Sequence, residues 1–157
     1  MQRSMRRKDR ELDREEALAV IDKCSFAVLA TVNPDGSPYT VPLSIARDNE
    51  LLYFHSAMEG HKIDNLKHDK RVSLCCVGDH RIVPEEFALF YESAIVSGKA
   101  EEIINDDEKI HALKIISLRH TPKIMHMFDA EIAKDLSRTS VWKITIDEIS
   151  GKGRRPE

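Results

Sequence analysis

The segment YFHSAMEGHK, at residues 53–62, gathers within one short stretch the side chains that an anion site needs. They supply a hydroxyl, an ammonium, two imidazoles and a flexible backbone position, from Ser56, Lys62, His55, His61 and Gly60. The apolar run before them predicts a strand and the residues after them predict a helix. Because a helix N-terminus presents unpaired N–H groups and a partial positive charge, it favours an anion such as a phosphate. A solvated helix start with incidental basic residues explains the same pattern equally well.

The segment YTVPLS, at residues 39–44, contains a proline inside a predicted strand. Because proline lacks a backbone N–H, Pro42 is expected at a sheet edge, at a bulge or beside a ligand. An ordinary edge strand is the simpler interpretation of this segment alone. The two segments are predicted on adjacent strands of one antiparallel meander. A flat ligand could then lie along the first segment and place a phosphate tail at the second.

Other catalytic groups are hard to find in the sequence. No serine or cysteine lies in a nucleophile motif, no carboxylate pair is typical of glycoside chemistry, and no metal site is expected. Three histidines of a predicted helical region lack metal-ligand spacing and are expected at the surface: His111, His120 and His126. Redox chemistry in this protein would therefore depend on a cofactor.

Length and composition indicate a single domain over residues 1–157. Apolar residues make up 41% and charged residues 32%, which argues against a disordered or membrane protein. The formal charge of -3 excludes a broad basic face, so nucleic acid is not an expected partner. A membrane is not expected either, because the apolar runs are too short to span one. A basic leader at residues 1–10 precedes the domain, and the polar tail at residues 151–157 is expected to be flexible.

The three cysteines form no disulfide framework. Their number is odd, and the adjacent Cys75 and Cys76 point to opposite faces of one predicted strand. Together with Cys24 they are expected as reduced, buried thiols, which favours a cytoplasmic protein.

The elements that must position these groups are mostly strands. Apolar runs bounded by turn residues, including the turn NPDG at residues 33–36, predict six strands: residues 25–32, 37–46, 51–57, 71–79, 87–104 and 139–149. Helical spacing and N-cap residues, among them Asp13, predict four helices: residues 13–24, 59–68, 105–120 and one starting at 121–122. Residues 79–86 are predicted as a loop and Gly98 as a bulge. The fold class is therefore mainly β with flanking helices (α+β), an antiparallel barrel or curled sheet.

The sequence resembles the nitroimidazole-resistance (Nim) branch of the pyridoxamine 5'-phosphate oxidase-like, FMN-binding split-barrel superfamily. The resemblance covers nearly the whole chain and is carried by MRRKDREL (5–12), YTVPLS (39–44), LYFHSAMEGHKIDNL (52–66), FYESAIVSGKAEEI (90–103) and WKITIDEISGK (142–152). It implies a six-stranded split barrel that forms a homodimer, with flavin in two equivalent clefts between the subunits.

The resemblance also implies roles for individual residues. The strand expected along the isoalloxazine and ribityl chain contributes Tyr39, Val41, Pro42 and Ser44. The phosphate is expected to contact His55, Ser56, Gly60, His61 and Lys62. The partner subunit is expected to bring Ser93, and with less support Glu92, towards the flavin. The oxidases of this superfamily have an arginine-lysine pair where this chain has His61-Lys62, so a permanent charge is replaced by a titratable one.

The implied function is a flavin-dependent oxidoreductase that passes electrons from a reduced nicotinamide to a small acceptor such as a 5-nitroimidazole. FMN is the expected cofactor, with FAD as the alternative, and His55 is the catalytic candidate nearest the substrate. The arginine-rich substrate motif of the vitamin oxidases has no match here, which argues against pyridoxamine phosphate oxidation. The alternative is a non-catalytic flavin or haem carrier, or a sensing module, on the same fold, with His55 or His61 as a haem ligand.

Overall fold

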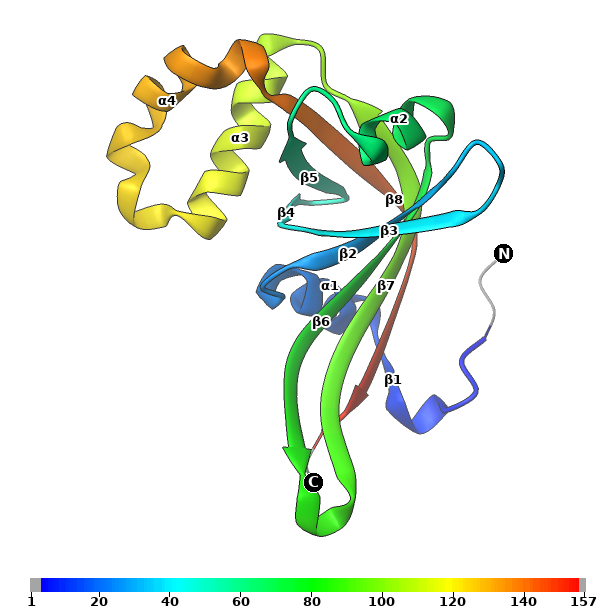
Figure 1. The fold of residues 1–157 in the computed structure, drawn as a ribbon. Helices are drawn as coiled ribbons and strands as arrows, with labels where there is room; N and C mark the ends of the chain where they lie inside the picture. The colour runs from blue at the N-terminus through cyan, green and yellow to red at the C-terminus, as the bar shows by residue number, and fades with distance from the viewer. Residues whose placement is uncertain (1–3, 156–157) are drawn as a thin grey trace.

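The computed structural model describes residues 4–155 as an antiparallel sheet with helices on its flanks (Figure 1). The strands are β1 (Glu11–Leu12), β2 (Ala27–Val32), β3 (Pro38–Leu43), β4 (Ala46–Asp48), β5 (Leu51–Ser56), β6 (Arg71–Val83), β7 (Ala88–Glu102) and β8 (Ser140–Arg154). The α-helices are α1 (Arg14–Lys23), α2 (His61–His68), α3 (Asp106–His120) and α4 (Phe128–Asp135). Arg3 of the predicted leader and residues 156–157 of the predicted tail lie outside the described residues.

The sheet is open and has the strand order β3-β2-β6-β7-β8-β5-β4, with β1 beside β8. The mainly β architecture with flanking helices is confirmed, and it is consistent with a split barrel. The expected count of six strands is wrong, because the described residues form eight. All six predicted strands are present, and the two additional ones, β1 and β4, are too short to show an alternating apolar pattern.

The predicted three-stranded meander is also wrong. β3 pairs only with β2, whereas the β4–β5 hairpin lies at the other end of the sheet, where β5 pairs with β8. The chain leaves β3 at Ser44 and Ile45, and the Ile45 side chain is 1% exposed. The Ile45 carbonyl accepts hydrogen bonds from Arg119 and His120 of α3 instead of a neighbouring strand. Burial of one isoleucine thus divides the predicted long strand in two.

The β6–β7 hairpin is longer than the sequence predicts. Residues 79–83 were expected in a loop, but they continue β6 and pair with β7 up to Val83 opposite Ala88. Cross-strand hydrogen bonds override the polar local sequence there, and only Pro84–Glu86 forms a turn. A register shift against β8 lies at Gly98, where the sequence predicts a bulge. The extra residue is in β8, because Ser97 pairs with Glu148 and Gly98 pairs with Ile146.

The predicted flexible tail is wrong for residues 151–154, which complete β8 between β1 and β7. Gly151 and Gly153 are buried in this part of the strand. A Cβ atom on Gly151 would lie 2.8 Å from the side chains of Ala17 and Leu12. Close backbone packing, which an apolar pattern does not reveal, therefore orders these residues.

Two apolar clusters lie on the two faces of β5. Phe54 belongs to the main core with α1 and Trp142, whose ring is stacked with that of Phe54. Tyr53 belongs to a smaller cluster with Ala112 and Ile116 of α3. Because side chains alternate along a strand, His55 follows Tyr53 on the α3 side as the strand ends.

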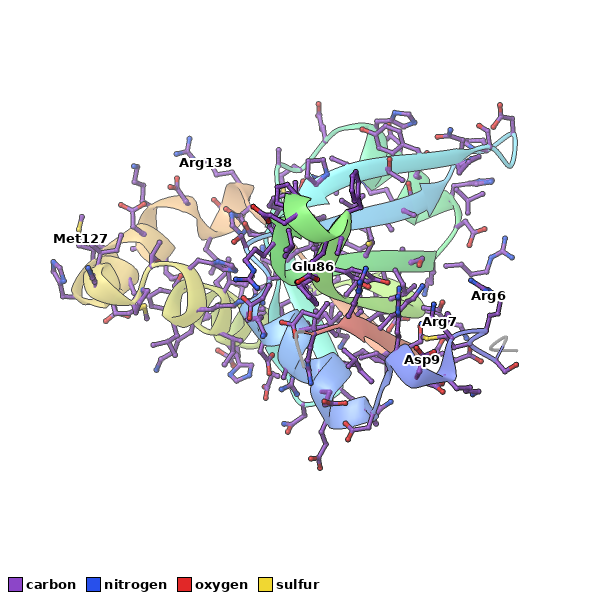
Figure 2. The ribbon with its side chains drawn as sticks, turned by 90° about the horizontal axis from the view of Figure 1, so that it is seen from below. Arg6, Arg7, Asp9, Glu86, Met127 and Arg138 are labelled. Atoms are coloured by element: carbon purple, nitrogen blue, oxygen red, sulfur yellow. The ribbon has the colours of Figure 1, made fainter. Side chains whose placement is uncertain are left out.

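The helices α3 and α4 form an arm beside β4 and β5 (Figure 1). Figure 2 shows Met127 and Arg138 on this arm, on the opposite side of the sheet from Arg6, Arg7 and Asp9. None of the helices in residues 4–155 is long and apolar enough to cross a membrane. The three cysteines are free thiols, and Cys24 and Cys76 are buried as expected, whereas Cys75 is half-buried.

Candidate functional site

A cavity of about 380 Å³ opens between β3, the end of β5 and the start of α2. Its lining consists of Tyr39, Val41, His55, Ser56, Ala57, Glu59, Gly60, His61 and Lys62. All but Ala57 and Glu59 were predicted from the sequence. β3 and β5 are not paired, so the curl of the sheet, and not a shared ladder, brings the two predicted segments close to α2 (Figure 1). Both segments line the cavity there.

Alternation along β3 decides which of its residues reach the cavity. Tyr39 and Val41 are two positions apart, half-buried and part of the lining, whereas Pro42 and Ser44 are exposed and are not. β3 is an edge strand that pairs only with β2, so the edge position expected for Pro42 is confirmed. The cofactor contacts of Pro42 and Ser44 stay a prediction.

The start of α2 carries the groups predicted for a phosphate. Gly60 precedes the helix with a φ of 136°, which glycine adopts without strain. The Gly60 carbonyl accepts the N–H groups of Ile63 and Asp64, and no side chain caps the helix. The uncapped helix start, the Lys62 ammonium and the Ser56 hydroxyl therefore border one cavity, a combination that suits a phosphate.

The His61 ring is held by two contacts. It stacks on the Tyr39 ring with 3.9 Å between centroids, and its Nε2 atom lies 2.7 Å from Asn33 Oδ1. Asn33 also accepts a hydrogen bond from the buried Asn65. Sequence reasoning assigned no site role to either asparagine, because Asn33 was interpreted only as a turn residue and a lone helical asparagine gives no signal.

His55 borders two cavities. Besides the first, it lines a cavity of about 180 Å³ between α3 and α4, whose other walls are Leu113, Ile116, Ser117, Phe128, Glu131, Ile132, Asp135, Leu136 and Thr139. Desolvation of the ring, followed by the charges of Lys62 and His120, lowers the pKa of His55. The neutral imidazole is therefore favoured at the boundary between the two cavities.

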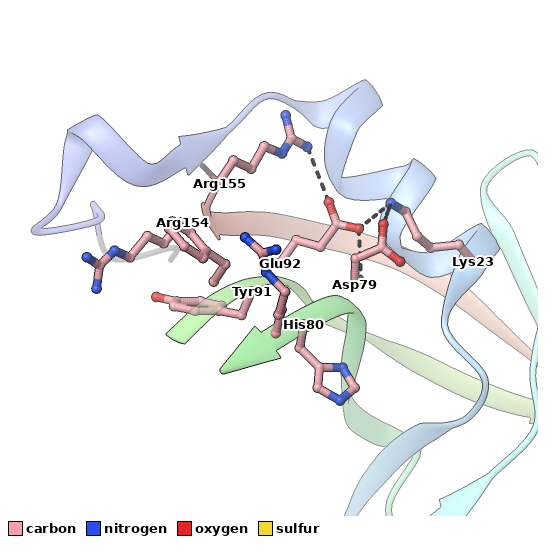
Figure 3. Close-up of a pocket in the computed structure, with 9 residues that line it drawn as sticks. Lys23, Asp79, His80, Tyr91, Glu92, Arg154 and Arg155 are labelled. Carbon is pink, nitrogen blue, oxygen red and sulfur yellow. Dashed lines mark hydrogen bonds and ion pairs between the residues drawn. The ribbon is translucent and has the colours of Figure 1, made fainter. Parts of the chain in front are cut away.

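Ser93 lies on β7, away from the cavity lining, and its hydroxyl donates to the Lys152 carbonyl at 3.4 Å. Its neighbour Glu92 lines a different cavity of about 380 Å³, shown in Figure 3. The Glu92 side chain is 6% exposed and forms ion pairs with Lys23 and Arg155. Burial would raise the pKa of Glu92, but hydrogen bonds from Lys23, Asp79 N–H and Arg155 outweigh burial and lower it. The paired carboxylate joins α1 and Arg155, the residue after β8, to β7.

The chain belongs to the pyridoxamine 5'-phosphate oxidase family, whose model matches residues 13–153. It is similar to a candidate 5-nitroimidazole antibiotic resistance protein from Bacteroides thetaiotaomicron VPI-5482, with 28% identity, 91% of this chain and 86% of the other covered, and a TM-score of 0.75. The resemblance deduced from the sequence is thereby confirmed.

Two further solved structures share this fold. An FAD-binding protein from Mesorhizobium loti is 25% identical, with 93% of this chain and 98% of the other covered and a TM-score of 0.70. An FAD and haem binding protein from Mycobacterium smegmatis is 23% identical, with 92% and 72% covered and a TM-score of 0.76, a likeness of fold alone. No curated protein matches the chain.

The residues of the first cavity fit the phosphate end of a flavin. Lys62 and the uncapped helix start favour an anion, and the stacked Tyr39 and His61 rings provide an aromatic wall. The volume lies within the usual range for small-ligand sites. Glu59 is the one carboxylate in the lining, and its charge opposes anion binding. No group of three or more His, Cys, Asp or Glu side chains among the described residues could hold a metal ion.

Proposed function

We propose that the protein is an FMN-dependent oxidoreductase that reduces small acceptors, nitroaromatics such as 5-nitroimidazoles among them, at the expense of a reduced nicotinamide. The observation that carries this proposal is the convergence of Lys62, the uncapped start of α2 and the Tyr39–His61 stack on one cavity. A bound flavin supplies two-electron chemistry, accepting a hydride from the donor and passing two electrons to the acceptor. FAD is the alternative cofactor, because an adenylate can extend from the same phosphate.

The groups that line the cavity have four roles in this proposal. Lys62, Ser56 and the first N–H groups of α2 hold the phosphate. Tyr39 and Val41 exclude water on the β3 side, and Gly60 lets the backbone approach the ligand closely. His55, at the boundary of both cavities, is the catalytic candidate that faces the acceptor.

We also propose a homodimer with flavin at the subunit interface. The side chains of Phe26, Val77 and Ile95 are 57%, 48% and 42% exposed. Phe26 and Val77 line a further cavity of about 510 Å³ with Val28 and Cys75. Ser93 lies opposite Val77 in the β6–β7 ladder, so an interface at this face would include it. Exposed apolar surface of this kind is typical of an interaction site.

The test is a visible spectrum of the purified full-length protein, followed by single-turnover kinetics without oxygen. An oxidoreductase retains FMN, is reduced by a reduced nicotinamide, and is reoxidised by a nitroaromatic faster than free FMN. A flavin carrier retains the cofactor but shows no acceptor-dependent reoxidation above that of free FMN. A Soret band indicates a haem carrier, and a colourless protein that does not bind added FMN contradicts the proposal.

A further inference from the structure

We propose that Asn33 and Asn65 are positioning residues that hold His61 as the Nε2–H form, so that His61 binds an anion only through Nδ1 and only when both ring nitrogens are protonated. The inference rests on the proposed phosphate site and deepens it. It makes binding of a phosphorylated ligand a proton-coupled event at one histidine. The direction of each hydrogen bond between the β2–β3 turn and α2 decides which ring nitrogen carries the proton.

Asp35, in the β2–β3 turn, sets the direction of these hydrogen bonds. The Ser37 hydroxyl lies 2.6 Å from Asp35 Oδ1, and hydrogen bonds from the Ser37 side chain and backbone lower the pKa of Asp35. Because an ionised carboxylate only accepts, the Ser37 hydroxyl donates its proton to Asp35. The Ser37 oxygen then accepts from Asn33 Nδ2 at 2.9 Å. The amide nitrogen of Asn33 therefore faces Ser37, and its oxygen faces the opposite way.

The oxygen of Asn33 has two partners. Asn65 Nδ2 donates to it at 2.8 Å, and His61 Nε2 lies 2.7 Å from it. The amide of Asn65 is itself anchored, because its Nδ2 also donates to Thr31 Oγ1 at 3.0 Å and both residues are at most 2% exposed. Because an amide oxygen has no proton to give, the hydrogen bond to His61 requires a proton on Nε2. The tautomer of His61 therefore follows from these hydrogen bonds and from the ionised carboxylate of Asp35.

The other ring nitrogen of His61, Nδ1, carries no proton in the neutral ring. A 180° flip of the ring would keep its stacking on Tyr39, but it would place a ring carbon instead of Nε2 against the Asn33 oxygen and lose that hydrogen bond. Nε2 already donates its proton to Asn33, so the neutral ring presents only Nδ1 to an anion. The lone pair of Nδ1 repels that anion. Protonation of Nδ1 converts this nitrogen into a charged donor. An arginine at position 61 would carry its charge permanently. The hydrogen-bond chain from Asp35 through Ser37 and Asn33 to His61, called the relay below, instead makes anion binding at this site conditional on proton uptake.

The neighbouring charges act in both directions. The titratable groups that face His61 or join its network are Tyr39 from β3, His55 from β5, Glu59 and Lys62 at the start of α2, and Asp35 through Ser37. The Lys62 ammonium repels an imidazolium at His61, whereas the Glu59 carboxylate and a bound phosphate attract it. Phosphate binding and protonation of Nδ1 are thus reciprocally linked.

The first experiment measures the tautomer in the flavin-free protein by NMR of 15N-labelled histidine side chains. We expect neutral His61 in the wild type to be the Nε2–H form. Asn33→Ala removes the acceptor and allows the Nδ1–H form, whereas Asn33→Asp keeps an acceptor and retains the Nε2–H form. Ser37→Ala, at an exposed turn position, releases the Asn33 amide without changing the core. Asn105→Ala, which removes the cap of α3 far from the cavity, is the control.

The second experiment compares FMN with riboflavin, which lacks the phosphate. Asn33→Ala is expected to reduce the proton uptake that accompanies FMN binding and to leave riboflavin binding unchanged, because the Nδ1–H form that it allows can donate to the phosphate without a second proton. Calorimetry of the wild type in buffers of different ionisation enthalpy is expected to show proton uptake with FMN, and no such uptake with riboflavin or in the His61→Gln variant.

The outcomes separate the relay from the proposed function. A wild-type Nδ1–H tautomer, or a tautomer that Asn33→Ala and Ser37→Ala both leave unchanged, overturns the relay. Equal losses of FMN and riboflavin affinity in Asn33→Ala also overturn it, because they indicate a general structural defect. A wild type that binds neither ligand contradicts the proposed function, while the NMR result in the flavin-free protein still decides whether the relay exists.

Discussion

At the scale of single residues, the cavity lining carries one positive charge from a lysine and one negative charge from a carboxylate, both near the start of a short helix. Lys62 is half-buried, and its ammonium is the one side chain in the lining that carries a permanent positive charge. Glu59, three positions earlier, is exposed and carries the opposite charge. The side-chain charges of the lining nearly cancel, so the uncapped N–H groups of α2 contribute much of its preference for anions.

Lys62→Ala is expected to weaken FMN binding at least about tenfold by removing a charge-assisted hydrogen bond to the phosphate. Riboflavin binding is expected to stay the same, since that ligand has no phosphate. Fluorescence titration of both ligands measures the effect, and Lys67→Ala, an exposed lysine of the same helix, is the matched control. An unchanged FMN affinity would remove Lys62 from the phosphate site.

Glu59→Gln is expected to tighten FMN binding about two- to fivefold, because it removes a partly screened negative charge from the lining. The gain is expected to shrink as salt is added. The same titration at low and high ionic strength measures it, with Glu85→Gln on the β6–β7 turn as control. A weaker affinity in Glu59→Gln would mean that this side chain binds the ligand directly.

The lowered pKa of His55 has a defined effect on stability. The unfolded chain protonates this imidazole at a higher pH than the folded chain does. The contribution of His55 to folding stability is therefore lost as the pH falls from the pKa of the unfolded chain towards the lower pKa of the folded chain. His55→Gln is therefore expected to lose less stability than the wild type between about pH 7 and about pH 5. Thermal unfolding at both pH values measures the difference. Parallel losses in the two proteins would contradict a lowered pKa of His55 in the folded chain.

At the scale of elements, most of the fold was predictable because its signals are local. Asp13 caps α1 in a reciprocal capping box with Glu16, and the six long strands follow their apolar runs. The break at Ile45 could not be predicted, because it depends on carbonyl contacts with α3, many residues later in the chain. The order of residues 151–154 likewise comes from backbone packing against α1 and β1.

The candidate site was predictable from the sequence only where its residues form a local pattern, with suitable side chains at suitable positions along one element. Lys62, Ser56 and Gly60 form a phosphate pattern around a helix start, which sequence alone reveals. Asn33 and Asn65 act through hydrogen bonds across 28 and 32 positions, to His61 and to each other, and no local pattern records such contacts. Pro42 was placed beside Val41 by sequence, but the alternation of β3 separates the two.

The register shift between β7 and β8 at Gly98 makes a prediction about the sheet itself. A Cβ atom on Gly98 would lie 2.1 Å from the Thr145 carbonyl oxygen of β8. Gly98→Ala must therefore displace the β7–β8 ladder, and we expect it to reduce the free energy of unfolding by about 2 kcal/mol or more. Urea denaturation measures this change. Ser97→Ala, at the exposed preceding position, is the control, and similar stabilities of the two variants would exclude a tight backbone contact.

At the scale of the whole molecule, the exposed apolar face and the open cavity both leave room for a second copy of the chain. Phe26, Val77 and Ile95 come from the β2, β6 and β7 region, so a second copy of the chain could cover them together. Ser93 lies beside this face and away from the cavity of its own chain. A dimer would cover apolar surface and bring a second Ser93 to the flavin in one step, which connects assembly to cofactor retention.

Ile95→Lys is therefore expected to weaken self-association about tenfold or more and to lower flavin retention in parallel, because a buried unpaired ammonium opposes the interface. Sedimentation velocity and the flavin content of the purified protein measure the two effects. Ile104→Lys, at an isoleucine that is 78% exposed just before α3, is expected to change neither. A wild type that sediments only as a monomer at micromolar concentration would contradict the shared cleft, and a monomeric Ile95→Lys that keeps all its flavin would show that one chain completes the site.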